Sequence, residues 1–206
     1  MTGERYHRQT MRARCYDYSW PGMYFVTVCA AERRSIFGEI RDGTMFLNRW
    51  GELVREEWLR TAEMRPDVEL DEFVVMPNHF HGIIIFTHVA MVGDGSTLVP
   101  VGAHCVRPPS DSPATNSGGA RSAPLQRAAR SLGSVMAGFK AAVTRRIGQP
   151  VWQRNYFEHI IRHDHGLNRL RDYIIGNPSC WLADRENPNR QGVDECEQWL
   201  ATGLSV

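Results

Sequence analysis

Short apolar runs rich in β-branched and aromatic residues, each bounded by turn residues, predict the β-strands of this chain. Two shorter strands are expected where a turn signal precedes apolar residues, at Met45–Leu47 behind Asp42-Gly43 and at Val151–Gln153 behind Pro150. Three longer runs predict strands at Met23–Cys29, Val68–Met76 and His79–Phe86, the last two joined as a hairpin through Pro77-Asn78. The runs come from both halves of the chain, which indicates a sheet assembled from distant segments.

Apolar residues at helical spacing predict helices between these strands. One helix follows Asn48, a favourable N-cap residue, and ends before Pro66. Its apolar face contains Trp50, Leu53, Val54 and Trp58, and that of a second helix contains Leu132, Val135, Met136, Phe139, Val143 and Ile147. A third helical segment is expected from Tyr156, with a break near Gly166, to a stop at Asn177-Pro178. The order of elements predicts an α+β fold of the ferredoxin-like class, an antiparallel sheet with helices packed mainly on one face.

The length of 206 residues suits a single domain, 1–206, with one elaborated loop. Residues at about 89–124 are dense in Pro, Gly and Ser, which predicts a flexible insertion; a loop that orders on binding DNA is the alternative. The residues at about 190–206 are acidic on balance and are expected to form a peripheral tail.

The overall composition is that of an ordinary soluble protein, with 42% hydrophobic and 23% charged residues. No apolar run approaches the about 20 residues needed to cross a bilayer, and the polar N-terminus lacks the apolar core of a signal peptide. Five widely spaced cysteines argue against a disulfide framework or a zinc ribbon. We therefore expect a cytoplasmic protein that does not associate with membranes.

Charge is distributed unevenly, which indicates a polyanionic partner. Residues 106–175 contain eleven basic and four acidic residues, whereas the remainder contains thirteen basic and nineteen acidic ones. All the basic residues except Lys140 are arginine, which suits bidentate phosphate contact but also accompanies a GC-rich genome.

The histidines His79 and His81 are the first candidates for chemistry. Side chains two apart in a strand point to the same face, so these two imidazoles lie side by side and make half of a metal site. A second pair, His163 and His165, falls in the predicted helix break and is interpreted as surface histidines.

Tyr156 and His159 supply the other half of this hypothesis. They are three residues apart on a predicted helix, a spacing that puts both on one face. The imidazole would complete the metal site and the phenol would attack a group bound to the metal; a role for Tyr156 in the core is the alternative. Free tyrosine has a pKa of about 10, and a divalent cation on the attacked phosphate would give the help it needs.

The motif PNHFHG, followed later by QRNYFEHIIR, resembles the HUH-type transposases that act on single-stranded DNA with one tyrosine, and among them the REP-associated tyrosine transposases. The similarity runs from about Arg14 to Trp181 and includes YFVTVC, LNRWG, LDEFVVMPNHFHGIII and an NP..W segment. It does not extend to the insertion at 89–124.

The resemblance implies a ferredoxin-like sheet with His79 and His81 on a central strand, His159 as third metal ligand and Tyr156 as nucleophile. It implies cleavage of single-stranded DNA near hairpins or palindromic repeats, with a 5′-phosphotyrosine link and a free 3′-OH. Mg²⁺ or Mn²⁺ is the expected ion. The protein would then be nucleoid-associated, and a homodimer and a monomer both stay open.

Further residues are expected to contact the DNA backbone. Near the site these are Gln153, Arg154 and Arg162, and on the basic side of the second helix they are Arg127, Arg130, Lys140 and Arg145.

Three other classes of protein are alternatives to a transposase. A histidine-triad hydrolase is disfavoured because Ile83 stands where its third histidine would be; a hairpin-binding protein with little or no catalytic activity and a purely structural domain are the others.

Overall fold

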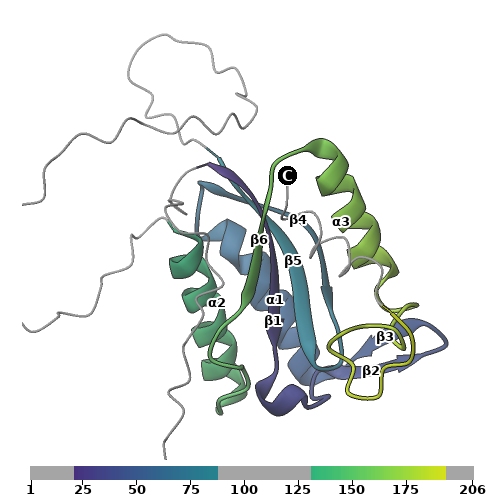
Figure 1. Cartoon of the computed structure of the whole chain (residues 1–206). Helices are drawn as coiled ribbons and strands as arrows, with labels where there is room; N and C mark the ends of the chain where they lie inside the picture. Colours follow the sequence, from purple (N-terminus) through teal and green to yellow (C-terminus); the bar gives the residue numbers. More distant parts are fainter. Residues whose placement is uncertain (1–20, 88–130, 194–206) are drawn as a thin grey trace, which may run out of the picture.

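A computed structural model of the chain describes residues 21–87 and 131–193 (Figure 1). Its centre is a four-stranded sheet in the order β4-β5-β1-β6, in which every neighbouring pair is antiparallel. The strands are β1 (Gly22–Cys29), β4 (Val68–Val75), β5 (His79–Phe86) and β6 (Phe157–Ile161). The predictions for the first three are confirmed, and so is the α+β fold class.

Two helices, α1 (Arg49–Glu63) and α2 (Leu132–Ile147), pack on one face of this sheet, as predicted. Asn48 caps α1, because its side-chain oxygen accepts hydrogen bonds from the amides of residues 50 and 51 at 2.8 and 3.1 Å. Trp58 of α1 and Phe139 of α2 meet the ring of Phe80 from β5, with ring centroids 4.7 and 5.4 Å away. The cluster that contains these rings is the larger of the two hydrophobic cores in the described part of the chain.

The third helix, α3 (Asp164–Gly176), covers the opposite face of the sheet. Its buried residues pack on strand residues that point away from α1 and α2; the cluster consists of Phe25, Ile83, Ile161, Leu167, Leu170 and Ile174. Figure 1 shows α3 on the other side of the sheet from α2. A polar site between the sheet and α3 is therefore separated from the main core by the sheet itself.

A small hairpin, β2 (Gly38–Arg41) and β3 (Thr44–Leu47), stands apart from the main sheet, and a short 3-10 turn (Ala31–Arg33) precedes it. The predicted turn at Asp42-Gly43 is confirmed, with φ of 50° and 72°. Two positive φ values in succession are typical of the tight turn that matches strand twist.

The helical segment predicted from Tyr156 is wrong in its first part, because Phe157–Ile161 is strand β6 and pairs with the otherwise free edge of β1. Its second part is confirmed as helix α3, which runs through Gly166 without a break and ends before Asn177. Hydrogen bonding to that edge decided the conformation of a short apolar segment whose spacing fits either structure. The strand predicted at residues 151–153 reduces to one bridge, between Ala30 and Trp152. The insertion at 89–124, Arg127, Arg130 and residues 194–206 of the tail lie outside the described residues.

None of the helices within residues 21–87 and 131–193 has the length and apolar character needed to cross a membrane.

Candidate metal centre

His79 and His81 lie on β5 and point to the face covered by α3. The Cα partners of His79 and His81 on β1 are Cys29 and Thr27, and the two imidazoles are 0% and 3% exposed. Their Nε2 atoms are 2.9 Å apart. The expectation that the two rings sit side by side on one strand face is met.

The other nitrogen of each ring is held by a hydrogen bond. Nδ1 of His79 lies 2.8 Å from Oδ1 of Asn78, and Nδ1 of His81 lies 2.8 Å from Oγ1 of Thr27. The amide nitrogen of Asn78 already donates to the carbonyl oxygens of Arg33 and Glu186, at 3.1 and 2.7 Å. Oδ1 of Asn78 must therefore accept, which places the proton of His79 on Nδ1. The lone pair on Nε2 of His79 then faces Nε2 of His81, 2.9 Å away, and is the one that would bind a metal.

Burial keeps both imidazoles neutral. It lowers the pKa of His79 to about 3, with a further contribution from the charge of Arg33. Burial also holds the pKa of His81 well below its usual range, and the neighbouring His79 lowers it further. Neutral imidazoles are the form that binds metals, so the site does not have to lose a proton first.

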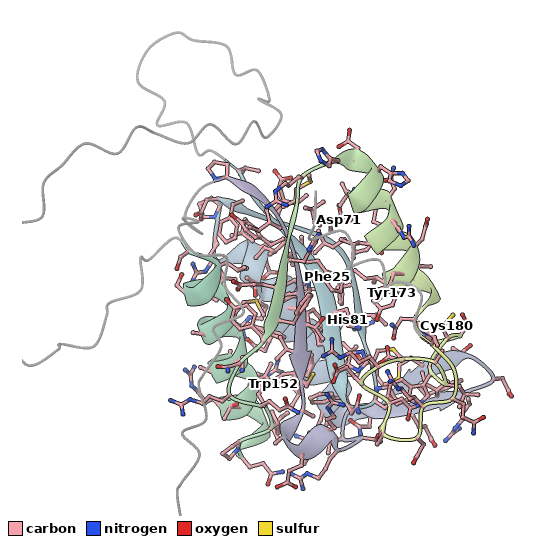
Figure 2. All side chains as sticks on the ribbon, in the orientation of Figure 1. Phe25, Asp71, His81, Trp152, Tyr173 and Cys180 are labelled. Carbon is pink, nitrogen blue, oxygen red and sulfur yellow. The ribbon has the colours of Figure 1, made fainter. Side chains whose placement is uncertain are left out.

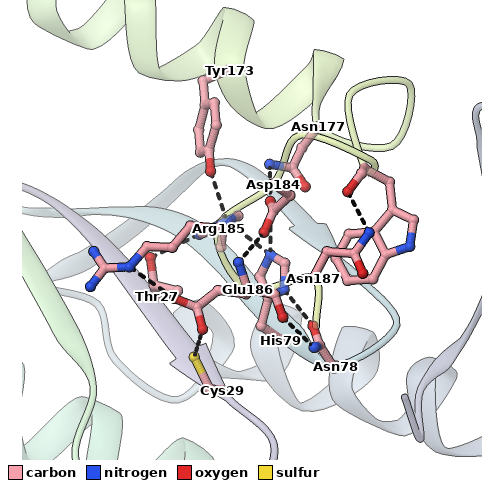
Figure 3. Close-up of polar contacts among 12 residues, drawn as sticks. Thr27, Cys29, Asn78, His79, Tyr173, Asn177, Asp184, Arg185, Glu186 and Asn187 are labelled. Atoms are coloured by element: carbon pink, nitrogen blue, oxygen red, sulfur yellow. Dashed lines mark hydrogen bonds and ion pairs between the residues drawn. The ribbon is translucent and has the colours of Figure 1, made fainter. Parts of the chain in front are cut away.

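Asp184 brings a carboxylate to the histidine pair. Its Oδ2 lies 3.7 Å from Nε2 of His79, and one ligand atom from each of His79, His81 and Asp184 lies within 4.8 Å of the other two. The carboxylate is oriented by the side-chain amide of Asn177, 2.9 Å from Oδ2, and by the amide nitrogen of Glu186, 2.6 Å from Oδ1. Figure 3 shows these contacts converging on the site.

The segment after α3 holds this carboxylate in place. Glu186 ties the segment to β1 and to the following turn, since its Oε2 accepts from Sγ of Cys29 at 3.2 Å and lies 3.2 Å from the guanidinium of Arg33. The ring of Trp181 stacks on His79, with centroids 5.9 Å apart. The segment therefore closes the site from the side opposite the sheet.

Tyr173 of α3 lies beside the group formed by His79, His81 and Asp184. Its hydroxyl oxygen is 3.4 Å from Nε2 of His81, and its ring centroid is 5.2 Å from that of His81 and 6.2 Å from that of Phe25 (Figure 2). A phenol, two imidazoles and a carboxylate thus meet between β5 and α3.

The group fits a divalent cation. Two ligands bound at about 2.1 Å and at a right angle to each other are about 3 Å apart, which matches the 2.9 Å between the two Nε2 atoms. The side-chain oxygen Oδ1 of Asn177 is buried beside the site and has no hydrogen-bond partner in the described part of the chain. Two imidazoles with oxygen donors suit Mn²⁺ at least as well as Mg²⁺.

The residues predicted to complete the site lie elsewhere. His159 is on β6 and pairs with Phe25, whereas His81 on β5 pairs with Thr27, two residues further along β1. Two strand spacings and this offset put the two histidines about 12 Å apart. Tyr156 precedes β6 and packs against the core on the face of α1 and α2. The prediction that these two residues share one helix face is therefore wrong.

Sequence reasoning missed Asp184 and Tyr173. Tyr173 falls on a flank of the apolar stripe of the third predicted helix, three residues after Leu170, and a tyrosine at the edge of such a stripe was a usable signal. Asp184 is in an irregular segment, where no periodicity indicates which way a side chain points.

The predicted DNA contacts fall into two kinds. Arg145, Arg154 and Arg162 are exposed and available to a phosphate. Lys140 instead donates to three consecutive backbone carbonyls, those of residues 153, 154 and 155, at 2.6, 3.2 and 3.2 Å. Its ammonium group therefore stabilises the connection that leads into β6. The backbone amide of Gln153 donates a hydrogen bond to the carbonyl oxygen of Cys29 at 2.9 Å, which fixes the same connection to the end of β1.

Comparison with solved structures shows which class this fold belongs to. The chain resembles a REP-associated tyrosine transposase solved in complex with a REP hairpin, with a TM-score of 0.50 and 20% identity over 82% of this chain and 73% of that one. The resemblance read from the motifs is thus confirmed at the level of the fold.

No family model matches the chain. An uncharacterized protein of Haemophilus influenzae (strain ATCC 51907 / DSM 11121 / KW20 / Rd) is 34% identical over 185 residues, which are 87% of this chain and 93% of that protein. The chain belongs to the same family as this Haemophilus protein.

Proposed function

We propose that the protein is a metal-dependent enzyme that nicks and rejoins single-stranded DNA near hairpins through a 5′-phosphotyrosine intermediate. The observation that carries the proposal is the position of the Tyr173 hydroxyl, 3.4 Å from one of two neutral, paired imidazoles. A transposase fold and the motifs PNHFHG and QRNYFEHIIR support the same activity. The cation would be Mg²⁺ or Mn²⁺.

His79 and His81, through Nε2, and Asp184 would hold this cation. When bound, the ion supplies charge neutralisation and orientation of the scissile phosphate. The sequence predicts His159 as the third ligand, but the geometry favours Asp184 in that role, because among the described residues its carboxylate groups with both imidazoles.

Tyr173 is the better candidate for the nucleophile than Tyr156, which packs against the core on the other face of the sheet. Its oxygen would form a bond to phosphorus while the bond from phosphorus to the 3′ oxygen breaks. The phenol gives up one proton and the departing 3′ oxygen takes up one, so the step is balanced. Phosphodiester energy is kept in the tyrosine linkage, and a 3′-OH can later reverse the step without ATP.

The DNA partner would be a single strand with a hairpin or palindromic repeat; the transposase of similar fold was solved bound to a REP hairpin, which supports a hairpin ligand. Arg154 and Arg162, both exposed, would contact its backbone near the site. Such DNA is found in the nucleoid, and the protein would work in the cytoplasm, as a monomer or a homodimer.

One observation favours a second function, that of a hairpin-binding protein that does not cleave. His79 and Asp184 are only 0% and 2% exposed, so a DNA phosphate reaches them only if the segment after α3 moves. An enzyme would open this segment on binding DNA, whereas a binding protein would keep it closed.

The test is a denaturing gel of purified protein mixed with a labelled single-stranded hairpin oligonucleotide and Mn²⁺. We expect a covalent protein–DNA band that is absent in Tyr173→Phe and His79→Ala and present in the matched variant Tyr156→Phe. Loss of the band in Tyr156→Phe alone would return the nucleophile to Tyr156. A shift on a native gel without any covalent band, over a panel of genomic repeat hairpins, would establish the binding function instead.

A further inference from the structure

Strand β4 is irregular at the point where it faces α3. Leu70 pairs with Ile84 of β5, but the next pair joins Phe73 to Gly82, so β4 contains one residue more than β5 between the two pairs. Such a β-bulge places two residues of one strand, here Asp71 and Glu72, opposite one residue of its neighbour, Ile83. Asp71 lies on the face opposite Leu70, which is the face covered by α3, and its carboxylate contacts Arg171 of that helix.

Asp71 and Arg171 of α3 form a two-pronged ion pair. Nε of Arg171 is 2.9 Å from Oδ1 of Asp71, and a terminal nitrogen of Arg171 is 2.5 Å from Oδ2. Oδ1 also accepts from the amide of Glu72 at 2.7 Å, and Arg171 donates to Asn168 at 3.1 Å. Both partners are thus held from a second direction, which gives the contact a defined geometry.

The contact with Arg171 lowers the pKa of the Asp71 carboxyl, which therefore stays ionised and paired at neutral pH. The carboxylate side chain is 11% exposed and the guanidinium 38%, so the pair is shielded on one side only.

The position of this ion pair on α3 matters for Tyr173. At 100° per residue, Arg171 and Tyr173 fall on opposite flanks of the apolar stripe that packs on the sheet. Apolar packing is not directional and leaves the rotation of a helix about its axis weakly determined. A tyrosine hydroxyl about 9 Å from the axis moves by about 3 Å when the helix turns by about 20°. A turn of that size would break the 3.4 Å approach to His81.

We propose that the Asp71–Arg171 pair is a positioning device, which sets the rotation of α3 and thereby holds the hydroxyl of Tyr173 at the histidine pair. Its consequence for cleavage rests on the function proposed above, whereas its effect on the place of Tyr173 does not. Arg171 acts through the helix and touches none of the reacting groups.

The position of Tyr173 can be measured without DNA or metal, by ¹⁹F NMR of protein labelled with 3-fluorotyrosine. The signal of Tyr173 is identified by its absence in Tyr173→Phe, and the rings of His81 and Phe25 set its chemical shift. We expect Asp71→Asn to move this signal toward its position in the unfolded protein. The double variant Asp71→Arg/Arg171→Asp exchanges the two side chains, so that their combined length is unchanged. This exchanged pair should reverse at least about half of the shift of the Tyr173 signal.

Glu56→Gln is the control, because it removes a surface ion pair between α1 and Arg146 of α2, on the other face of the sheet, while Arg146 keeps its contact with Glu57. It should leave the Tyr173 signal in place. Where Asp71→Asn does not fold, Arg171→Lys takes its place, since it keeps the charge and removes the two-pronged contact. A Tyr173 signal that stays unchanged in a folded Asp71→Asn or Arg171→Lys protein overturns the inference.

Single-turnover cleavage at saturating DNA then tests the catalytic consequence. A misplacement of about 1 Å or more is expected to lower the rate by at least about tenfold, with DNA affinity within about twofold of wild type and recovery in the exchanged pair. An unchanged rate would contradict a positioning role in catalysis. Absence of cleavage in the wild type, together with the expected shift of the Tyr173 signal, would refute the proposed function and uphold the positioning of the helix.

Discussion

Acidification should destabilise the metal-free protein through His79. The pKa of this imidazole is about 3 in the folded protein, against about 6.5 for an unperturbed histidine. The unfolded chain therefore takes up a proton below about pH 6.5 that the folded protein refuses. The stability present above that pH is lost progressively as the pH falls toward about 3.

The magnitude follows from the difference between the two pKa values. Each pH unit in this window costs about 1.4 kcal/mol, so a fall from about pH 7.5 to about pH 5 should lower the free energy of unfolding by about 2 kcal/mol. His79 is 0% exposed, so screening by solvent does not reduce the effect. Burial shifts the pKa of His81 in the same direction and adds to the loss.

Urea unfolding in EDTA, followed by tryptophan fluorescence at several pH values, measures this slope. His79→Gln keeps a polar side chain of similar size that does not titrate, and it should have a shallower dependence on pH than the wild type. Carboxylates contribute equally to the pH dependence of stability in the two proteins. The difference between the slopes of the wild type and His79→Gln therefore isolates the contribution of His79. His165→Gln, an exposed position at the start of α3, should retain the wild-type slope. Equal slopes for His79→Gln and wild type would refute the reasoning.

Two further predictions concern the site and the strand that carries it. Mn²⁺ at about 100 times its dissociation constant should raise the free energy of unfolding by about 2.7 kcal/mol, because only the folded protein presents the three ligands together. Urea titrations with and without EDTA measure this gain; Asp184→Asn should weaken it, and a wild-type stability indifferent to Mn²⁺ would contradict the metal site. Gly82→Ala should cost about 1–3 kcal/mol, because the added Cβ would lie 2.8 Å from ring atoms of both Phe80 and Trp58. Gly176→Ala, with nothing within 4 Å of the added atom, is its control in the same thermal or urea unfolding experiment, and equal costs for the two would show that β5 is loosely packed.

Local pattern was enough to predict much of the fold and half of the site. The runs that form β1, β4 and β5, the stripes of α1 and α2, and the Asn48 cap depend on residues close together in the chain, so they are visible without a structure. The same holds for the paired histidines, because alternation along a strand alone puts their side chains on one face.

Tertiary contacts decided the rest. Phe157–Ile161 has a spacing compatible with a helix, and only the free edge of β1 makes it a strand, which moved Tyr156 and His159 away from the expected helix. Tyr173 reaches His81 across 92 positions of sequence, and Asp184 reaches His79 from an irregular segment. Such encounters depend on how α3 and the segment after it pack on the sheet. The sequence therefore determined which residues could bind a metal on β5, and the packing of distant elements decided which carboxylate and which phenol meet them there.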